Sequence, residues 1–462
     1  MPAPNPASSS EFGLQRSAGW ERVQRWLPAL FLLVPIGLWK IWSLRTSTRA
    51  EARPSVLVAT ERASSDSRAL ALTIPKQSNA VDREILTLQR LAISQPGRVD
   101  IWLLLGQAWV RKARETADPG YYLSANACAE VLLNLSPGNV QGLNLQALVL
   151  LNQHRFREAR QLAQSTVDKD PDSAMAWGSL SDAALELGDD QAALRAAGAM
   201  LALKPNLPSY SRMSYLQWLH GDSQAALESI RLAIDAAGDP SDKEPRAWAL
   251  VQAAQLFWHR GDYDGADAGY KQALEVWSNY APALIGRGRV ALAQDDAARA
   301  VGSFQAALDA SPTAEAAWLL GVSQLLTGNA PAANDAVKRS HEEARRADHR
   351  ALSLIYASEG VEQEEAVRLA RAEKAQRGDI YTDDALGWAL FKAGKIQEAK
   401  QSADRALRLG TKDARLLFHQ GAIHLAAGDA DVGRRLIAAA LGLNPKFDPL
   451  EAEEAKKLLG AR

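Results

Sequence analysis

The chain has 462 residues, 47% of them hydrophobic and 6% aromatic, and its 53 basic and 54 acidic residues leave a formal net charge of −1. This balance excludes a global positive field that could hold a nucleic acid backbone, so no nucleic acid partner is expected. Cys128 is the only cysteine, which excludes an intrachain disulfide and a thiolate metal cluster. The length exceeds that of an ordinary single core, but a repeat array escapes this limit because each unit packs only on its neighbours.

The N-terminal region contains the one stretch of the sequence that suits a membrane. Residues 1–25 form a polar tail, and residues 26–44 are apolar apart from Lys40. The apolar stretch reaches the ~18 residues needed to cross a bilayer, and Trp26 and Trp42 lie near its ends, as in interfacial aromatic belts. We predict an uncleaved transmembrane helix here. A cleaved signal peptide and a buried or interfacial helix remain alternatives.

The orientation of this segment is nearly balanced by charge. Three arginines precede it and three follow it, namely Arg16, Arg22, Arg25, Arg45, Arg49 and Arg53. A single N-terminal span before a long domain commonly acts as a signal anchor, so we expect a single-pass protein of the inner membrane with its C-terminal part outside the cytoplasm, in the periplasm. The cytoplasmic face is the alternative.

Three further regions follow the apolar segment. Residues 45–79 are rich in Ser, Thr, Arg and Ala without helical periodicity, which predicts a flexible linker. Residues 80–447 carry helical patterns throughout. Residues 448–462 begin with Asp448-Pro449, an N-cap followed by proline at the first helical position, and predict a capping helix with one apolar face.

A period of 34 residues organises the region 80–447. Gly387 lies 34 residues before Gly421, and Gly394 lies 34 residues before Gly428. The turn glycines separate two amphipathic halves in each unit, and small residues recur where the halves must approach closely. A fixed period of this size with two helical halves predicts an all-α solenoid of about ten units.

These positions resemble the tetratricopeptide repeat (TPR) family, whose units are helix-turn-helix hairpins stacked into a right-handed α-solenoid. The resemblance rests on Trp102, Leu105 and Gly106, on the recurring turn glycines, and on prolines that end second helices. It implies an interaction protein whose concave groove binds extended or helical peptides. The markers recur at Ala159, Ala193, Ala266, Ala300 and Ala399, at Gly188, Gly221, Gly261 and Gly328, and at Pro137, Pro171, Pro205, Pro312 and Pro445.

Catalytic and cofactor motifs were sought along the whole sequence. It contains no phosphate-binding glycine loop, no H-E-x-x-H and no G-x-S-x-G nucleophile elbow. His419 and His424 are five residues apart, which places them on different sides of a helix. We therefore expect no catalysis, no cofactor and no metal site. An enzyme whose site is assembled from residues far apart in sequence is the alternative of another class.

By the resemblance, the first helix of each unit lines the concave groove at positions that alternate with its packing residues. Trp, Tyr and Arg are the residue types that dominate binding energies at interfaces. Packing of the aromatic residues between repeats is an open alternative for each of them. The predicted groove residues are Arg212 (or Ser211), Tyr215, Trp218, Gln252, Gln255, Trp258, Arg289, Trp388, Phe391 and His419.

Two finer resemblances concern the ends of the array. The segments from Arg377, Leu409, Phe418 and Asn444 resemble a bacterial family of TPR proteins with one N-terminal hydrophobic segment. The segment from Leu88 is similar to the start of TPR domains in cytochrome c maturation factors, which implies a periplasmic maturation chaperone that binds the end of a polypeptide. The predicted function is a membrane-anchored scaffold that binds partner proteins or peptides through its groove, and the maturation chaperone is the alternative. The partner and the oligomeric state are not predicted.

Overall fold

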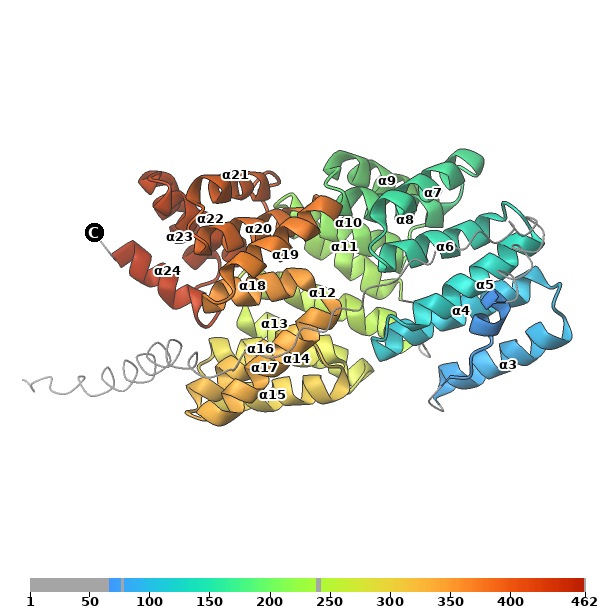
Figure 1. The fold of residues 1–462 in the computed structure, drawn as a ribbon, viewed down its shortest axis with the longest axis horizontal. Coiled ribbons are helices and arrows are strands. Elements are labelled where there is room, and N and C mark those ends of the chain that lie inside the picture. The colour runs from blue at the N-terminus through green and yellow to red at the C-terminus, as the bar shows by residue number, and fades with distance from the viewer. Residues whose placement is uncertain (1–65, 76–78, 238–241, 461–462) are drawn as a thin grey trace, which may run out of the picture.

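The computed structural model describes residues 66–75, 79–237 and 242–460, and every regular element in these residues is a helix. A short helical segment at 66–71 precedes 22 longer helices (Figure 1). Their bounds are α3 Ala80–Ser94, α4 Val99–Thr116, α5 Tyr121–Leu135, α6 Val140–Asn152, α7 Phe156–Lys169, α8 Ala174–Glu186, α9 Asp190–Leu203, α10 Leu207–Leu219, α11 Ser223–Asp235, α12 Lys243–His259, α13 Tyr263–Val276, α14 Ala281–Ala293, α15 Ala297–Ala310, α16 Ala314–Leu326, α17 Ala330–Ala347, α18 His349–Glu359, α19 Gln363–Gln376, α20 Ile380–Lys392, α21 Ile396–Ala406, α22 Ala414–Ala426, α23 Ala430–Leu443 and α24 Glu451–Gly460.

Consecutive helices pack as hairpins, from the pair α4 and α5 to the pair α22 and α23, which makes ten units in the described residues. The helix α3 packs on α4 at the start of the array, and α24 packs on α22 and α23 at its end. The predicted all-helical repeat architecture is therefore confirmed. No helix of the described residues is long and apolar enough to cross a bilayer. The predicted tail and the predicted membrane segment 26–44 lie outside those residues.

In units three, four, five and seven the turn inside the unit is built from a glycine followed by a capping residue. Gly188, for example, has a φ of +79°, a conformation that glycine adopts without steric cost, and Asp189 accepts a hydrogen bond from the amide of Ala192. Asp222 and Asp262 cap the second helices of their units in the same way. Asp429 follows the turn glycine of unit ten, but its side chain makes no cap and instead lies 3.1 Å from the ring of His424.

Close approach of the two helices inside a unit depends on small residues. Ala159, Ala193 and Ala300 are completely buried at these crossings. At Gly288 an added Cβ would come within 2.5 Å of the Phe304 ring, so the aromatic side chain fills the space that the glycine leaves. The recurring glycines of the first helices are therefore packing positions, and the residues on either side of them are directed elsewhere.

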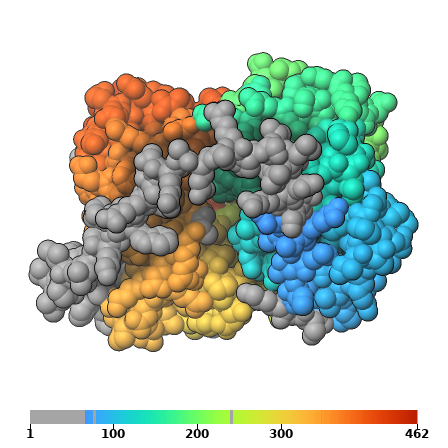
Figure 2. All heavy atoms as spheres, turned by 45° about the vertical axis from the view of Figure 1, so that its right-hand side comes forward, coloured from blue at the N-terminus to red at the C-terminus, as the bar shows by residue number. Residues whose placement is uncertain are grey.

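The superhelix closes on itself, because the turns of units three to five touch the loops between later units. The first helices of units three, four and five end in carbonyl groups that have no partner inside their helix. Gly378 N–H donates to Glu186 O, Thr411 Oγ1 donates to Leu219 O, and Asn444 Nδ2 donates to Trp258 O. Figures 1 and 2 show the orange C-terminal units beside the green units of the first half.

Ion pairs strengthen this contact between successive superhelical turns, which we call the seam. Arg408 lies 2.9 Å from Asp190, Lys446 lies 3.0 Å from Asp295, and the ring of Phe156 lies 5.0 Å from the Arg377 guanidinium. Residues between 151 and 221 positions apart in sequence therefore face each other. The seam turns an open array into a closed one with an interior.

The segment 66–75 is attached to the first unit, which corrects the prediction that all of residues 45–79 form a free linker. Trp109 Nε1 and Gln89 Nε2 both donate to the carbonyl oxygen of Ala71, at 3.0 and 3.3 Å. Ala71 itself is fully buried. Ser67 Oγ also donates to Glu130 of α5 at 2.5 Å. Because one buried alanine and a few hydrogen bonds carry the attachment, the hydrophobic pattern of the segment was too weak to predict it.

Candidate functional site

The closed superhelix encloses a cavity of about 1770 Å³ in its C-terminal half. The wall comes chiefly from the first helices of units five to ten, which are α12, α14, α16, α18, α20 and α22, and from the region before α24. Pockets for small molecules usually hold ~300–1,000 Å³. This cavity is larger, and its size suits a segment of a polypeptide chain.

The register of the repeat determines which side chains face the cavity. In three units the residue three positions before the packing glycine lines the wall, namely Ile285 before Gly288, Trp318 before Gly321 and Asp384 before Gly387. The glycine faces the second helix of its own unit. The side chain three residues before it lies on a neighbouring strip of the helix surface and faces the interior. One repeated position therefore supplies an apolar, an aromatic and an acidic group.

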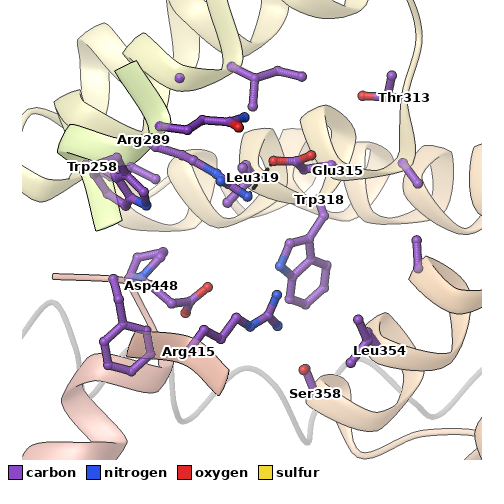
Figure 3. A pocket seen from close by; sticks show the side chains of 18 of the residues that line it. Trp258, Arg289, Thr313, Glu315, Trp318, Leu319, Leu354, Ser358, Arg415 and Asp448 are labelled. Atoms are coloured by element: carbon purple, nitrogen blue, oxygen red, sulfur yellow. Dashed lines mark ion pairs between the residues drawn. The ribbon is translucent and has the colours of Figure 1, made fainter. Parts of the chain in front are cut away.

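The apolar part of the wall is formed by aromatic and leucine side chains on opposite sides of the cavity. Trp318 on α16 extends its indole into the space, with Leu354 on α18 nearby (Figure 3). Trp258 on α12 lines the cavity near Arg289 and packs against Tyr263 with ring centroids 5.7 Å apart. These side chains offer the apolar contact surface that anchors peptide side chains in grooves.

The charged part of the wall has more acidic than basic groups. Eight Asp and Glu residues and five Lys and Arg residues line the cavity. Each of the five cations has a carboxylate within 4.0 Å, as in the pair of Arg289 with Glu315 shown in Figure 3. A terminal carboxylate would need an unpaired basic pocket. The cavity therefore gives no support to the alternative of a chaperone that binds a polypeptide terminus.

A buried network of charges lies directly behind the wall of units nine and ten. His419 Nδ1 lies 3.0 Å from both carboxylate oxygens of Asp384, and its Nε2 lies 3.3 Å from Glu451. Arg415 binds Glu451 through two hydrogen bonds of 2.8 and 2.9 Å. Burial by itself would lower the pKa of His419, but the charges of Asp384 and Glu451 outweigh it and raise the pKa to about 9. His419 is therefore a buried cation at neutral pH.

This network fixes the position of the cavity wall. Asp384 and Arg415 each have one side in the network and one side at the cavity, so they hold α20, α22 and α24 together while lining the space. Asp448 accepts hydrogen bonds from the amides of Leu450 and Glu451 and starts α24. The helix α24 is thus part of the wall as well as the end of the array.

Three of the predicted groove residues lie on the cavity wall. Gln255 and Trp258 on α12 and Arg289 on α14 all line it. Gln252 is partly buried one turn earlier on α12 and is not among the lining residues. These three residues belong to units five and six, which keep the regular period, and their role in binding stays a prediction.

Of the predicted residues of unit four, Tyr215 and Trp218 lie at the seam, whereas Arg212 and Ser211 lie within the array. Arg212 pairs with Asp182 of the preceding unit through contacts of 2.6 and 2.8 Å, and Ser211 is buried. Trp218 packs against His259 with ring centroids 4.7 Å apart and stacks on Tyr381 of unit nine at 6.2 Å. Tyr215, 5.8 Å from Trp218, borders a second cavity of about 80 Å³ between the turns. These aromatic residues connect units that are distant in sequence.

The three predicted residues of units nine and ten do not extend the groove. Trp388 is 1% exposed and His419 is fully buried, and their rings stack 4.0 Å apart. Phe391 packs on Trp388 with ring centroids 5.3 Å apart, outside the cavity wall. The expectation that they point into the groove is corrected. Trp388 occupies the repeat position of Arg289, one residue after the packing glycine, and this position is partly exposed in α14 but buried in α20.

Several cavity residues were missed at the sequence level. Trp318, Arg350, Leu354 and Arg415 line the cavity but were not assigned to the groove. The position of Trp318, three residues before the packing glycine, was a usable signal. Arg350 and Arg415 had none, because the seam and α24 place them there. Among the described residues no group of three His, Cys, Asp or Glu residues could hold a metal ion.

Comparison with known proteins identifies the repeats. The family profile described as Tetratricopeptide repeat matches residues 144–208, 251–315, 285–348 and 385–446. The chain belongs to the tetratricopeptide repeat family. A search of curated protein sequences found no match.

Solved structures similar to this TPR protein include three with low sequence identity. A tetratricopeptide repeat protein from Parabacteroides merdae is 17% identical, with 54% of this chain and 98% of that chain covered and a TM-score of 0.40. PilW, described as a widely conserved type IV pilus biogenesis factor, is 16% identical, with 46% and 96% covered and a TM-score of 0.39. The human IFIT1 dimer with PPP-AAAA is 14% identical, with 82% and 94% covered and a TM-score of 0.44.

Proposed function

We propose that this TPR protein is a membrane-anchored scaffold without catalysis of its own, which holds a segment of a partner protein inside its superhelix. The observation that carries the proposal is the cavity of about 1770 Å³ lined by first helices of six units. Its wall combines Trp258, Trp318 and Leu354 with paired charges, a mixture that suits a polypeptide segment with both apolar and polar side chains.

The chemistry of the wall favours a partner segment with basic and apolar side chains. The acidic groups outnumber the basic ones, and the basic ones are already paired inside the protein. A lysine or arginine of the partner would find the carboxylate of Asp413 beside Tyr381, and would share the carboxylate of Glu315 with Arg289. This makes the cavity complementary to a segment that is itself positively charged.

The proposal is tested by cross-linking and recovery of partners from the native membrane with the full-length protein. The variant Trp318→Ala with Glu315→Gln removes one aromatic and one acidic group from the wall. Loss of Trp or Arg anchors commonly costs ~2 kcal/mol or more of binding energy. We therefore expect recovery of the partner to fall at least about tenfold, in keeping with 1.4 kcal/mol per factor of ten.

The matched control is Trp177→Ala with Glu158→Gln. Trp177 lies on the first helix of unit three, and Glu158 forms a surface pair with Arg155 at 2.5 Å, so the same chemical groups are removed away from the cavity. We expect full recovery of the partner with this control. Equal recovery with both double variants would place binding outside the cavity and overturn the proposal.

The anchoring part of the proposal rests on residues 26–44, which we propose to cross the inner membrane with the repeats on the periplasmic side. Extraction of membranes with alkaline carbonate is expected to leave the full chain in the pellet, and a protease added to the periplasm is expected to cleave the repeats. Release into the supernatant would contradict the anchor, and protection from the protease would reverse the orientation.

A further inference from the structure

Exposed apolar side chains are distributed unevenly along the array. Within the described residues every exposed large hydrophobic side chain lies between Leu70 and Leu232, and eight of the thirteen lie between Leu70 and Leu135. Beyond Leu232 the described residues contain no exposed large hydrophobic side chain. Single exposed apolar residues are normal on a protein surface, but their concentration around the first unit marks a surface with a partner.

The two most exposed of these side chains, Ile74 and Ile93, belong to one patch where the chain joins the array. Gln89 on α3 donates to the carbonyl oxygen of Thr73 at 2.9 Å, so the segment 66–75 crosses α3 at Gln89. Leu86 and Ile93 stand three residues before and four residues after Gln89, and therefore flank the crossing. Ile74 follows Thr73 directly, with 74% of its side chain exposed, and Ile93 is 65% exposed. We call Ile74, Leu86 and Ile93, together with Leu70 on the same segment, the N-terminal patch.

We propose that the N-terminal patch rests on the surface of the lipid bilayer and orients the solenoid relative to the membrane. This inference rests on the proposed anchor at residues 26–44. The 21 residues 45–65 separate that segment from the first described residue. A flexible chain of this length has an end-to-end distance of roughly 25 Å. The point of attachment is the patch itself, because Leu70 and Ile74 belong to the segment that the linker continues into.

Tethering makes a small patch sufficient for contact with lipid. A short flexible linker gives an effective concentration in the millimolar range, so even weak affinity for the membrane surface keeps the patch in contact with it. The basic side chains Arg68 and Arg90 are exposed beside the patch, and they suit anionic headgroups. Asp66 is also exposed at the start of the segment, so the contact depends on apolar insertion as well as on charge.

A second copy of the chain fits the patch less well. A stable interface between proteins usually buries ~800 Å² on each partner and involves ~20–30 residues a side. Four side chains cannot supply this area, and apart from Leu91 the rest of the exposed face of α3 is polar, with Glu84, Thr87, Arg90 and Ser94. The bilayer surface requires no matching shape, which suits a small apolar patch with a polar border.

The test uses the full chain reconstituted in vesicles of phosphatidylcholine and phosphatidylglycerol that contain nitroxide-labelled lipid. The native Cys128 is fully buried, and burial raises the pKa of its thiol, so a fluorescent probe reacts selectively with an introduced cysteine. The probe is placed by Ile93→Cys in the patch. The matched control is Gly442→Cys near the end of α23, where an added side chain meets no neighbour.

We expect lipid nitroxide to quench the probe at position 93 at least twofold more than the probe at 442, and soluble iodide to show the reverse order. Adding Ile74→Glu and Leu86→Glu to the Ile93→Cys chain is expected to remove the difference, with the helical circular dichroism unchanged. Full retention in the pellet after carbonate extraction, but equal lipid quenching at both positions, would contradict contact of the N-terminal patch with lipid. The proposed anchor at residues 26–44 would still hold.

Two other outcomes also decide the question. Shielding of position 93 from both quenchers would mean that protein, from a second copy or from this chain, covers the patch, and would overturn contact with lipid. Release of the chain by carbonate would overturn the anchor and with it this inference. The carbonate result thus separates failure of the anchoring proposal from failure of the patch.

Discussion

At the scale of single residues, the most unusual side chain is His419, a cation with no exposed surface. It lies between Asp384 and Glu451 and stacks on Trp388. Its pKa in the folded protein is about 9, above the ordinary value of 6.5. A group with a raised folded pKa stabilises the fold fully below its unfolded pKa and loses that contribution as the pH rises through the folded pKa.

We expect His419→Gln to lower the free energy of unfolding by on the order of 3 kcal/mol below pH 6.5, since each unit of pKa shift corresponds to ~1.4 kcal/mol. The difference from the natural protein should shrink as the pH rises from 6.5 through 9. Urea unfolding followed by circular dichroism between pH 6 and 10 measures both effects. A difference that stays constant over this range would mean that His419 is neutral in the folded protein.

At the scale of an element, α3 is secured by an ion pair that is hidden from solvent. Asp82 accepts from the amide of Asn79 in a capping box and lies 2.8 Å from Lys112 of α4, and both charged side chains are essentially unexposed. Removal of one member of such a pair leaves an uncompensated buried charge. The first helix of the array therefore depends on Lys112 for its place on the first unit.

We expect Lys112→Met to destabilise the first unit by ~3–5 kcal/mol. The neighbouring change Arg111→Met is the matched control, because Arg111 pairs with Glu84 at the surface and such pairs contribute only ~0–1 kcal/mol. Hydrogen exchange of the α3 amides is the measurement. Equal exchange rates in the two variants would contradict the role of the buried pair, whereas the addition of Asp82→Asn to Lys112→Met should restore part of the protection.

At the scale of the whole molecule, the seam decides whether the array has an interior. Gly188 combines a φ of +79° with close contact across the seam, since an added Cβ would lie 2.5 Å from the carbonyl oxygen of Gly378. Gly394 has a similar φ of +74° at the same position of its repeat but meets no atom within 4 Å. Substitution of either glycine therefore has a similar conformational cost, but only at Gly188 would the new side chain meet an atom across the seam.

We expect Gly188→Ala to open the superhelix and raise the radius of gyration in small-angle X-ray scattering, and Gly394→Ala to leave it unchanged. Each variant should lose ~1–2 kcal/mol of stability from the left-handed conformation alone. Binding of the partner segment in the cavity should be lost in the Gly188→Ala variant and retained in the Gly394→Ala variant. An unchanged radius in both variants would show that the seam does not hold the turns together.

Much of the repeat unit could be predicted from particular residues. The spacing of Gly387 and Gly421 established the period, and the pattern of alanines and prolines placed the helix pairs. Gln255, Trp258 and Arg289 were placed on the cavity wall because their units follow the period closely. Trp388 and His419 were misplaced because the same repeat position is exposed in one unit and buried in another, depending on how closely the next unit packs.

The sequence by itself determined the helices, their turns and their stacking, because each of these depends on residues within one or two units. Only the tertiary structure decided that the superhelix closes, that Trp218 meets Tyr381, and that Arg415 and Arg350 face a common cavity. The physical reason is that small rotations between successive units accumulate along the array. No local pattern specifies their sum, so contacts between residues as far apart as Gly188 and Gly378 appear only in three dimensions.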